Sequence, residues 1–201
     1  FIFILIISRG GATKHYLLAG IFIGLGTTTK YTPIILILPV CVAHYFGSKE
    51  KGISFFSRPA FILLFLCFAM VVIFFFLGAP FCFIDYSNFI DSLHFRAKLG
   101  KVHTFGTGSG TAWLIYPRLL FTHPFLPLIQ FDLSGFLILG GIIWALYKRT
   151  RTDILFGIFP LLLYLMMGRW SFGSNRYMLP LMPFFCIWAA RAAVELSKRS
   201  R

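Results

Sequence analysis

The sequence has 201 residues, of which 58% are hydrophobic and only 12% are Asp, Glu, Lys or Arg. Soluble domains carry about a quarter charged residues, so this composition excludes a soluble globular domain. The formal net charge of +13 does not indicate nucleic-acid binding, because the basic residues form short clusters between apolar runs, as in loops that face an anionic membrane surface. The sequence therefore predicts an all-α, polytopic transmembrane helical bundle.

The apolar runs, taken in chain order, predict the membrane helices. Residues 1–7 are typical of the end of a membrane span and not of a signal peptide, because no basic segment precedes them. We therefore expect a single transmembrane domain over residues 1–201, belonging to a chain that lacks its N-terminal part. The further apolar runs are 16–46, 61–78, 133–147, 154–168 and 177–194.

The run 16–46 is too long for one span of about 20 residues and short for two. Near its middle, three threonines precede Lys30, and Pro33 follows shortly after. Proline and the threonine cluster disfavour a continuous helix, and a lysine is costly at the bilayer centre. We therefore predict a hairpin of two short helices that turns at Lys30. A single tilted helix is the alternative.

The positions of the basic residues favour the hairpin. With a turn at Lys30, twelve of the 19 Lys and Arg residues share one side of the membrane, as expected for cytoplasmic loops. These twelve are Arg9, Lys14, Lys49, Lys51, Arg58, Lys148, Arg149, Arg151, Arg191, Lys198, Arg199 and Arg201. A single helix over 16–46 would move the 8–15 cluster to the other side. The pattern predicts a multi-pass protein of the plasma (inner) membrane.

Residues 79–132 then form a long extracytoplasmic loop. Residues 85–99 mix Phe, Ile and Leu with polar side chains, a pattern typical of a helix that lies along the membrane surface. Residues 101–111 are rich in glycine and predict irregular structure, and 111–128 predict a second interfacial element. The loop is therefore expected to carry interfacial helices and no soluble domain.

Two basic residues are candidates for a functional site. Lys30 lies at the tip of a hairpin with short arms, and an ionisable group held near the membrane surface is a functional candidate. Arg176 lies at the outer end of the last span, and an arginine can hold phosphate oxygens in a bidentate fork. The alternatives are a snorkelling lysine and an arginine that anchors the interface.

Other motifs in the sequence give weaker evidence of a functional site. The glycine-rich stretch 105–111 lacks the Lys-Ser/Thr of a phosphate loop. His94, His103 and His123 do not match the spacing of a metal motif, so the sequence offers no metal ligands. Asp85 and Asp91 fit either an acid/base pair or the solvation of a helix end.

Three stretches together resemble the bacterial branch of the dolichyl-phosphate-mannose–protein mannosyltransferase family, whose members are GT-C-fold glycosyltransferases related to the aminoarabinose transferases of lipid A. The first stretch, 16–31, contains Gly-x-x-x-Gly-Leu and ends in Lys30-Tyr31. The second, 79–89, begins Ala-Pro-Phe and continues to an Asp and a Phe. The third opens with Arg176-Tyr177 and contains Leu-Pro-x-x-Pro. His103, which precedes a glycine, loosely matches a His-x-Gly element of the family.

The resemblance implies a membrane glycosyltransferase that moves a sugar from a polyprenyl-phosphate carrier to a lipid, glycan or protein acceptor at the extracytoplasmic face. It implies that Lys30, Tyr31, Arg176, Tyr177 and His103 bind the lipid phosphate. In this family the acidic catalytic residue lies in the first outer loop near the N-terminus, so the catalytic residues stay unknown here and this chain alone is expected to be inactive. Some members of the superfamily use a divalent metal, but the sequence shows no cofactor or ligand set for it.

Two other classes of protein fit some of these features. A transporter or flippase for a lipid-linked anionic substrate would also use a broken helix with a cation at the break. Transporters often carry such helices in pairs, and only one is present in this sequence. A structural subunit without a site of its own is the third alternative. The amphipathic segments of the loop favour an enzyme that opens onto the membrane surface.

The topology predicts that Ser109 is extracytoplasmic. In a variant without the native cysteines, Ser109→Cys should react with a membrane-impermeant thiol reagent in intact cells, because the 79–132 loop is then outside. Reaction only after the membrane is permeabilised would contradict this topology.

Overall fold

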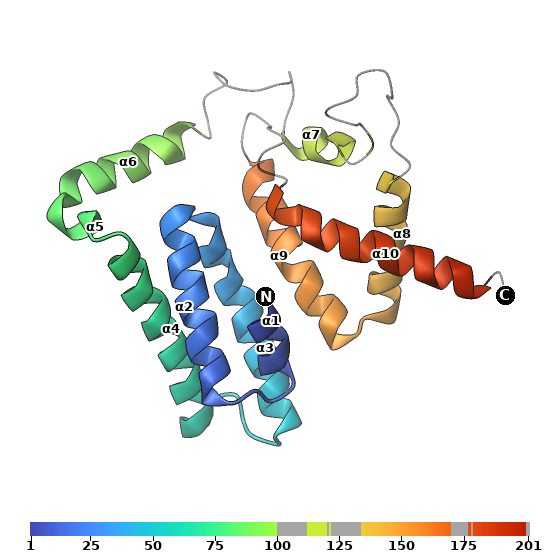
Figure 1. Cartoon of the computed structure of the whole chain (residues 1–201), viewed down its shortest axis with the longest axis horizontal. Helices are drawn as coiled ribbons and strands as arrows, with labels where there is room; N and C mark the ends of the chain where they lie inside the picture. The colour runs from blue at the N-terminus through green and yellow to red at the C-terminus, as the bar shows by residue number, and fades with distance from the viewer. Residues whose placement is uncertain (100–111, 120, 122–133, 170–176, 178, 200–201) are drawn as a thin grey trace. The chain divides into compact units, whose positions relative to one another are not determined.

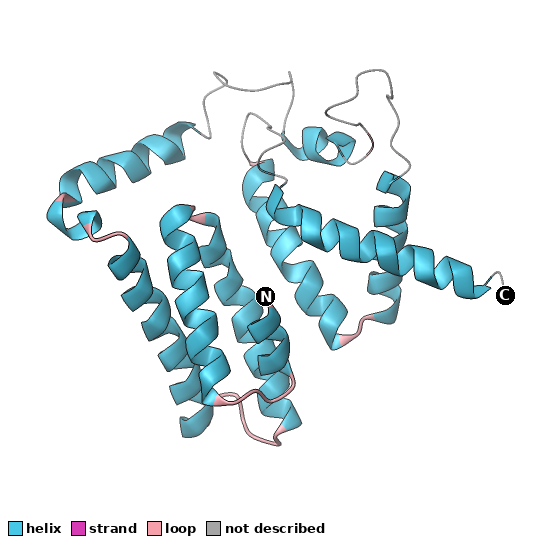
Figure 2. Cartoon of the chain, viewed as in Figure 1, coloured by secondary structure: helices cyan, strands magenta, loops and turns pink. Residues whose placement is uncertain are grey.

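The computed structural model of the chain describes residues 1–99, 112–119, 121, 134–169, 177 and 179–199. Across these residues every regular element is a helix and no strand occurs (Figures 1 and 2). The predicted all-α class is therefore confirmed. The chain divides into two compact units, Phe1–Leu93 with Gly157–Phe159, and His94–Phe156 with Pro160–Arg201.

The first unit contains a bundle of four helices whose direction alternates along the chain (Figure 1). The bundle helices are α1 (Ile2–Ser8), α2 (Thr13–Thr29), α3 (Ile37–Glu50), which a 3₁₀ turn at Thr32–Leu36 precedes, and α4 (Arg58–Gly78). Two short segments, 9–12 and 51–57, connect helices at one end of this bundle. The Lys30 turn and the exit from α4 lie at the opposite end.

Glycines allow α2 and α4 to pack side by side in the same direction. A Cβ added to Gly20 would lie 2.7 Å from the Met70 Cβ, and one added to Gly24 would lie 2.6 Å from the Val71 carbonyl oxygen. Such short distances require hydrogen in place of a side chain, as in the small-residue contacts common between membrane helices. The Gly-x-x-x-Gly stretch of the sequence is therefore a helix-packing motif in this chain.

Beyond α4, the chain forms α5 (Phe81–Ile84) and α6 (Tyr86–Leu99). The rings of Phe76 in α4 and Phe83 in α5 lie 4.1 Å apart between centroids. This contact holds α5 against the last turns of α4. The prediction of a helix over 85–99 is confirmed, whereas its position at a membrane surface stays a prediction.

The second unit contains α7 (Ala112–Leu119), α8 (Ser134–Lys148), α9 (Arg151–Gly168) and α10 (Met182–Arg199), with a 3₁₀ turn at Leu179–Leu181. In Figure 1, α10 crosses α8 and α9 at an angle. Asp153 caps the start of α9 through Thr150 and forms an ion pair with Arg191 of α10. This pair joins the two helices by a buried carboxylate, which requires a cation in contact.

The helix bounds match the predicted apolar runs. Within the described residues, four helices are long and apolar enough to cross a membrane: Thr32–Glu50, Arg58–Gly78, Arg151–Gly168 and Leu179–Lys198. A shorter apolar helix covers Gly135–Lys148. The predicted break of the 16–46 run is also confirmed, because α2 ends at Thr29 and α3 begins only at Ile37. The alternative of one continuous helix is wrong.

The contact between α2 and α4 predicts opposite effects for two glycine substitutions. Gly20→Ala should destabilise the protein by about 1–3 kcal/mol, because the added methyl group overpacks the α4 backbone. Gly157→Ala should be neutral or stabilising, because a Cβ there meets nothing within 4 Å and alanine favours helix. Thermal unfolding of the purified variants in detergent measures both effects. Equal melting temperatures for the two variants would contradict the close packing.

Candidate functional site

The Lys30 turn ends α2 through side chains that bond back to the helix. The hydroxyl groups of Thr27, Thr28 and Thr29 donate hydrogen bonds to the carbonyl oxygens of Ile23, Leu25 and Gly26 at 2.7, 2.6 and 2.8 Å. Such bonds from a side chain back to a helix carbonyl favour bending or ending the helix. The three threonines therefore supply the physical reason for the break.

Lys30 itself is the residue at which the backbone leaves the helix. Its φ and ψ angles are −155° and 130°, an extended conformation, while its N–H still donates to the Gly26 carbonyl oxygen at 3.1 Å. Pro33 follows in the 3₁₀ turn, where its fixed φ suits a helix start. Lys30 is exposed, and 40% of the Tyr31 surface is exposed.

The exit from α4 lies beside this turn. A Cβ added to Gly78 would lie 2.7 Å from the Thr28 Cγ2 atom, so the last turn of α2 contacts the last residue of α4. The chain then passes through Pro80 and α5 to Asp85. Two of the three stretches that carry the family resemblance therefore meet at one end of the first unit.

Asp85 occupies a structural position at the junction of α5 and α6. One of its carboxylate oxygens accepts a hydrogen bond of 2.8 Å from the Asn88 side-chain amide, and its backbone carbonyl accepts from the Phe89 N–H at 3.0 Å. The carbonyl contact is the first hydrogen bond of α6, and the carboxylate bonds to a side chain of the same first turn. They support helix-end solvation over an acid/base pair with Asp91.

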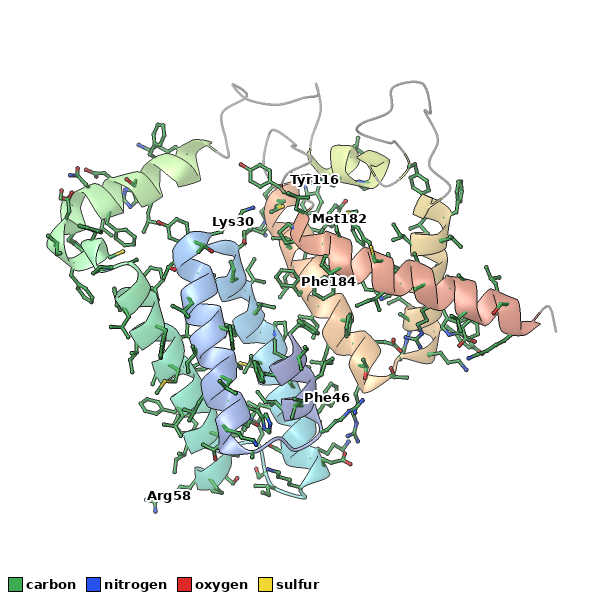
Figure 3. All side chains as sticks on the ribbon, viewed as in Figure 1. Lys30, Phe46, Arg58, Tyr116, Met182 and Phe184 are labelled. Atoms are coloured by element: carbon green, nitrogen blue, oxygen red, sulfur yellow. The ribbon has the colours of Figure 1, made fainter. Side chains whose placement is uncertain are left out.

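Lys30 and the basic turns lie at opposite ends of the first unit. Figure 3 shows Lys30 at one end of the bundle and Arg58 at the other. Because the helix directions alternate, Arg9, Lys14 and Lys51 belong to the Arg58 end. In this unit the predicted separation of Lys30 from the cytoplasmic basic clusters therefore matches the arrangement of the helices.

The other predicted site residues do not lie in the described part of the first unit with Lys30 and Tyr31. Tyr177 is partly exposed and belongs to the second unit, just before the 3₁₀ turn that leads into α10. His103 and Arg176 lie outside the described residues. The prediction that Lys30 and Arg176 converge on one phosphate site therefore stays a prediction. Among the described residues, no group of three or more His, Cys, Asp and Glu side chains could hold a metal ion.

One polar pair was missed in the sequence. The Tyr16 hydroxyl of α2 lies 2.8 Å from Nδ1 of His44 in α3, and both side chains are buried. Tyr16 and His44 are equally far from Lys30 in sequence. In an antiparallel hairpin such residues lie opposite each other, so the hairpin prediction itself contained the signal for this contact.

Comparison with known proteins identifies no matching family model, no matching curated protein and no matching solved structure.

Proposed function

We propose that this chain is part of a membrane glycosyltransferase that takes its sugar from a polyprenyl-phosphate carrier, and that Lys30 binds the carrier phosphate. The observation that carries the proposal is the position of Lys30. It is an exposed cation at a helix break, at the end of an apolar bundle opposite the basic turns. The resemblance in the stretches 16–31, 79–89 and 176–183 gives the reaction class.

The proposed membrane placement follows from the exposed surface of the helices. Large apolar side chains are exposed along α4, among them Phe61, Phe65, Val72 and Leu77. Exposed apolar surface of this extent suits contact with lipid and not with water. With the bundle spanning a membrane, the basic turns face the cytoplasm and the Lys30 turn faces the extracytoplasmic surface. There Lys30 can meet the phosphate of a lipid whose chain stays in the bilayer.

The chemistry needs a cation close to the leaving group. In the proposed transfer, an acceptor oxygen forms a bond to the anomeric carbon of the sugar as the bond from that carbon to the phosphate oxygen breaks. The acceptor proton passes to a base, and the polyprenyl phosphate leaves with the bonding electron pair. A fixed cation stabilises the charge that develops on the phosphate. Lys30 would supply it, and Arg176 and His103 are the further candidates.

Tyr31 and Tyr177 have a secondary role in the proposal. A tyrosine hydroxyl can donate a hydrogen bond to a phosphate oxygen, and its ring suits the boundary between headgroups and acyl chains. Both tyrosines follow a basic residue directly, at Lys30 and at Arg176. The proposal therefore assigns each basic residue and its tyrosine neighbour to the headgroup region of the carrier lipid.

A transporter for a lipid-linked anion is the second candidate, and the same helix break favours it. Transporters use broken helices with charged ends at their substrate sites. Proteoliposomes with a polyprenyl-phosphate-linked hexose separate the two functions when the whole protein is used. A transferase releases polyprenyl phosphate from this lipid, whereas a transporter moves the intact lipid between leaflets.

The phosphate role of Lys30 predicts a selective loss of binding. In nanodiscs of phosphatidylcholine, the chain should bind a polyprenyl monophosphate more tightly than the uncharged polyprenol of the same length, measured by native mass spectrometry. Lys30→Gln should weaken binding of the phosphate by about tenfold or more, because a hydrogen bond to a charged group contributes about 1.5–3 kcal/mol. Binding of the polyprenol should not change.

Lys14→Gln is the matched control, because it removes the same charge from the other end of the same helix. This variant should retain the binding of the parent chain. Equal affinity for polyprenol and polyprenyl phosphate would contradict the proposal, as would equal losses in the two lysine variants.

A further inference from the structure

The short helix α5 exposes nearly all of its apolar side chains. The exposed fractions are 72% for Phe81, 65% for Phe83 and 77% for Ile84. Cys82, the remaining residue of α5, is buried, and 65% of Tyr86 at the start of α6 is exposed. We call the four exposed side chains of Phe81, Phe83, Ile84 and Tyr86 the α5 patch. Soluble monomers rarely expose so many large apolar side chains together, so the patch indicates a partner.

The α5 patch has a fixed position at the end of α4 (Figure 1). The rings of Phe76 in α4 and Phe83 in α5 are in contact. The Phe83 N–H donates to the Pro80 carbonyl oxygen at 3.1 Å. The Asp85 N–H donates to the Phe81 carbonyl oxygen at 2.9 Å. The exposed side chains therefore belong to a hydrogen-bonded turn that packs on the last turns of α4.

The length of α4 determines the depth of the α5 patch in a membrane. This helix has 21 residues, so it is about 31 Å long at a rise of 1.5 Å per residue. The hydrocarbon core of a bilayer is about 30 Å thick. With Arg58 at one headgroup layer, as in the proposed membrane placement, Gly78 reaches the opposite boundary of the hydrocarbon. The α5 patch then begins where acyl chains meet headgroups.

The residue types around the α5 patch suit this boundary. Three of its four side chains are aromatic, and such side chains are enriched between headgroups and acyl chains. Leu77 in the last turn of α4 is also exposed, so the apolar surface of α4 continues into the patch. The exposed Asp85 carboxylate follows directly and accepts a hydrogen bond from Asn88. An apolar turn joined to a polar helix start is typical of a segment that lies in the boundary layer.

The charge of this segment limits the kind of partner. Between Arg58 and Arg96 the sequence contains no Lys or Arg, and its only formal charges are those of Asp85 and Asp91. Attraction of anionic lipids by basic side chains therefore does not act at the α5 patch. Burial of apolar surface has to supply the interaction. The partner that fits is the acyl-chain region of a lipid layer, whatever its headgroups.

We propose that the α5 patch inserts among the acyl chains at the extracytoplasmic boundary of the bilayer and anchors the start of α6 there. The apolar side chains lie below the headgroups, and the Asp85 carboxylate lies in the headgroup layer. The anchor fixes the level at which the chain leaves α4, beside the Lys30 turn. This inference rests on the membrane placement proposed above, but not on the glycosyltransferase assignment or on phosphate binding by Lys30.

Photo-crosslinking of the full chain in nanodiscs of phosphatidylcholine tests the anchor. The variants are Phe81→p-benzoyl-phenylalanine and Ile84→p-benzoyl-phenylalanine. Irradiated benzophenone inserts into nearby C–H bonds, so mass spectrometry should find phosphatidylcholine joined to the protein at both positions. The same group at Asp91, an exposed polar position of α6, should give little lipid adduct. Replacing half of the phosphatidylcholine by phosphatidylglycerol should leave the total lipid yield at positions 81 and 84 unchanged, because the patch has no cation.

Three results would overturn the anchor. The first is a crosslink from positions 81 and 84 to a second copy of the chain in place of lipid, which would make the α5 patch a protein interface. The second is an equal lipid yield at positions 81, 84 and 91. The third is a yield at positions 81 and 84 that rises with phosphatidylglycerol, which would show attraction by charge.

Hydrogen exchange of the backbone N–H groups in nanodiscs gives an independent readout. Phe81→Asp should speed exchange over residues 81–89 by about tenfold or more, because a large apolar side chain is no longer buried in lipid. Exchange in α4 should stay slow, because the mostly exposed Phe81 side chain contributes little packing within the protein. Ser87→Asp is the matched control, since each new carboxylate lies four residues before an aspartate. Equal exchange over 81–89 in the two variants would contradict the anchor.

Discussion

The first unit depends on the way in which α2 ends at Lys30. Three consecutive threonine hydroxyls bond to carbonyl oxygens of the last turns, and the chain then turns through an extended Lys30 into a 3₁₀ turn with Pro33. Threonine hydroxyls that bond back to carbonyl groups of the preceding turn compete with the regular helix and favour bending or ending it. The threonines and Pro33 therefore favour an end to α2 here, and the chain returns as the antiparallel helix α3.

The turn at Lys30 determines what lies at each end of the bundle. It brings Tyr16 opposite His44, and it allows Gly20 and Gly24 to pack on α4 in a parallel direction. Lys30 then lies beside the exit from α4, and the basic turns lie at the other end. The proposed carrier-phosphate site therefore lies at the end of the bundle opposite the basic turns.

Hydropathy and backbone chemistry made much of this fold predictable. The apolar runs located the helices, and Pro33 with the threonines located the break. Periodicity could not assign side-chain partners, so the ion pair of Asp153 with Arg191 in the second unit appeared only in three dimensions. The Gly-x-x-x-Gly stretch was interpreted as part of a family signature, whereas its contacts show helix packing. The predicted phosphate site joins residues of two units, and its assembly stays a prediction.

The most direct test of the account measures the depth and side of two positions in a membrane. Spin labels are placed at Thr29→Cys and Ser54→Cys in a chain without native cysteines. Collisions with oxygen report the depth of each label, and collisions with a water-soluble relaxation agent added outside sealed vesicles report its side. If α3 spans the membrane between the two positions, both labels lie at headgroup depth and the external agent reaches only one of them. Two labels reached from the same side, or a Thr29 label at the centre of the bilayer, would contradict the hairpin and the phosphate role of Lys30.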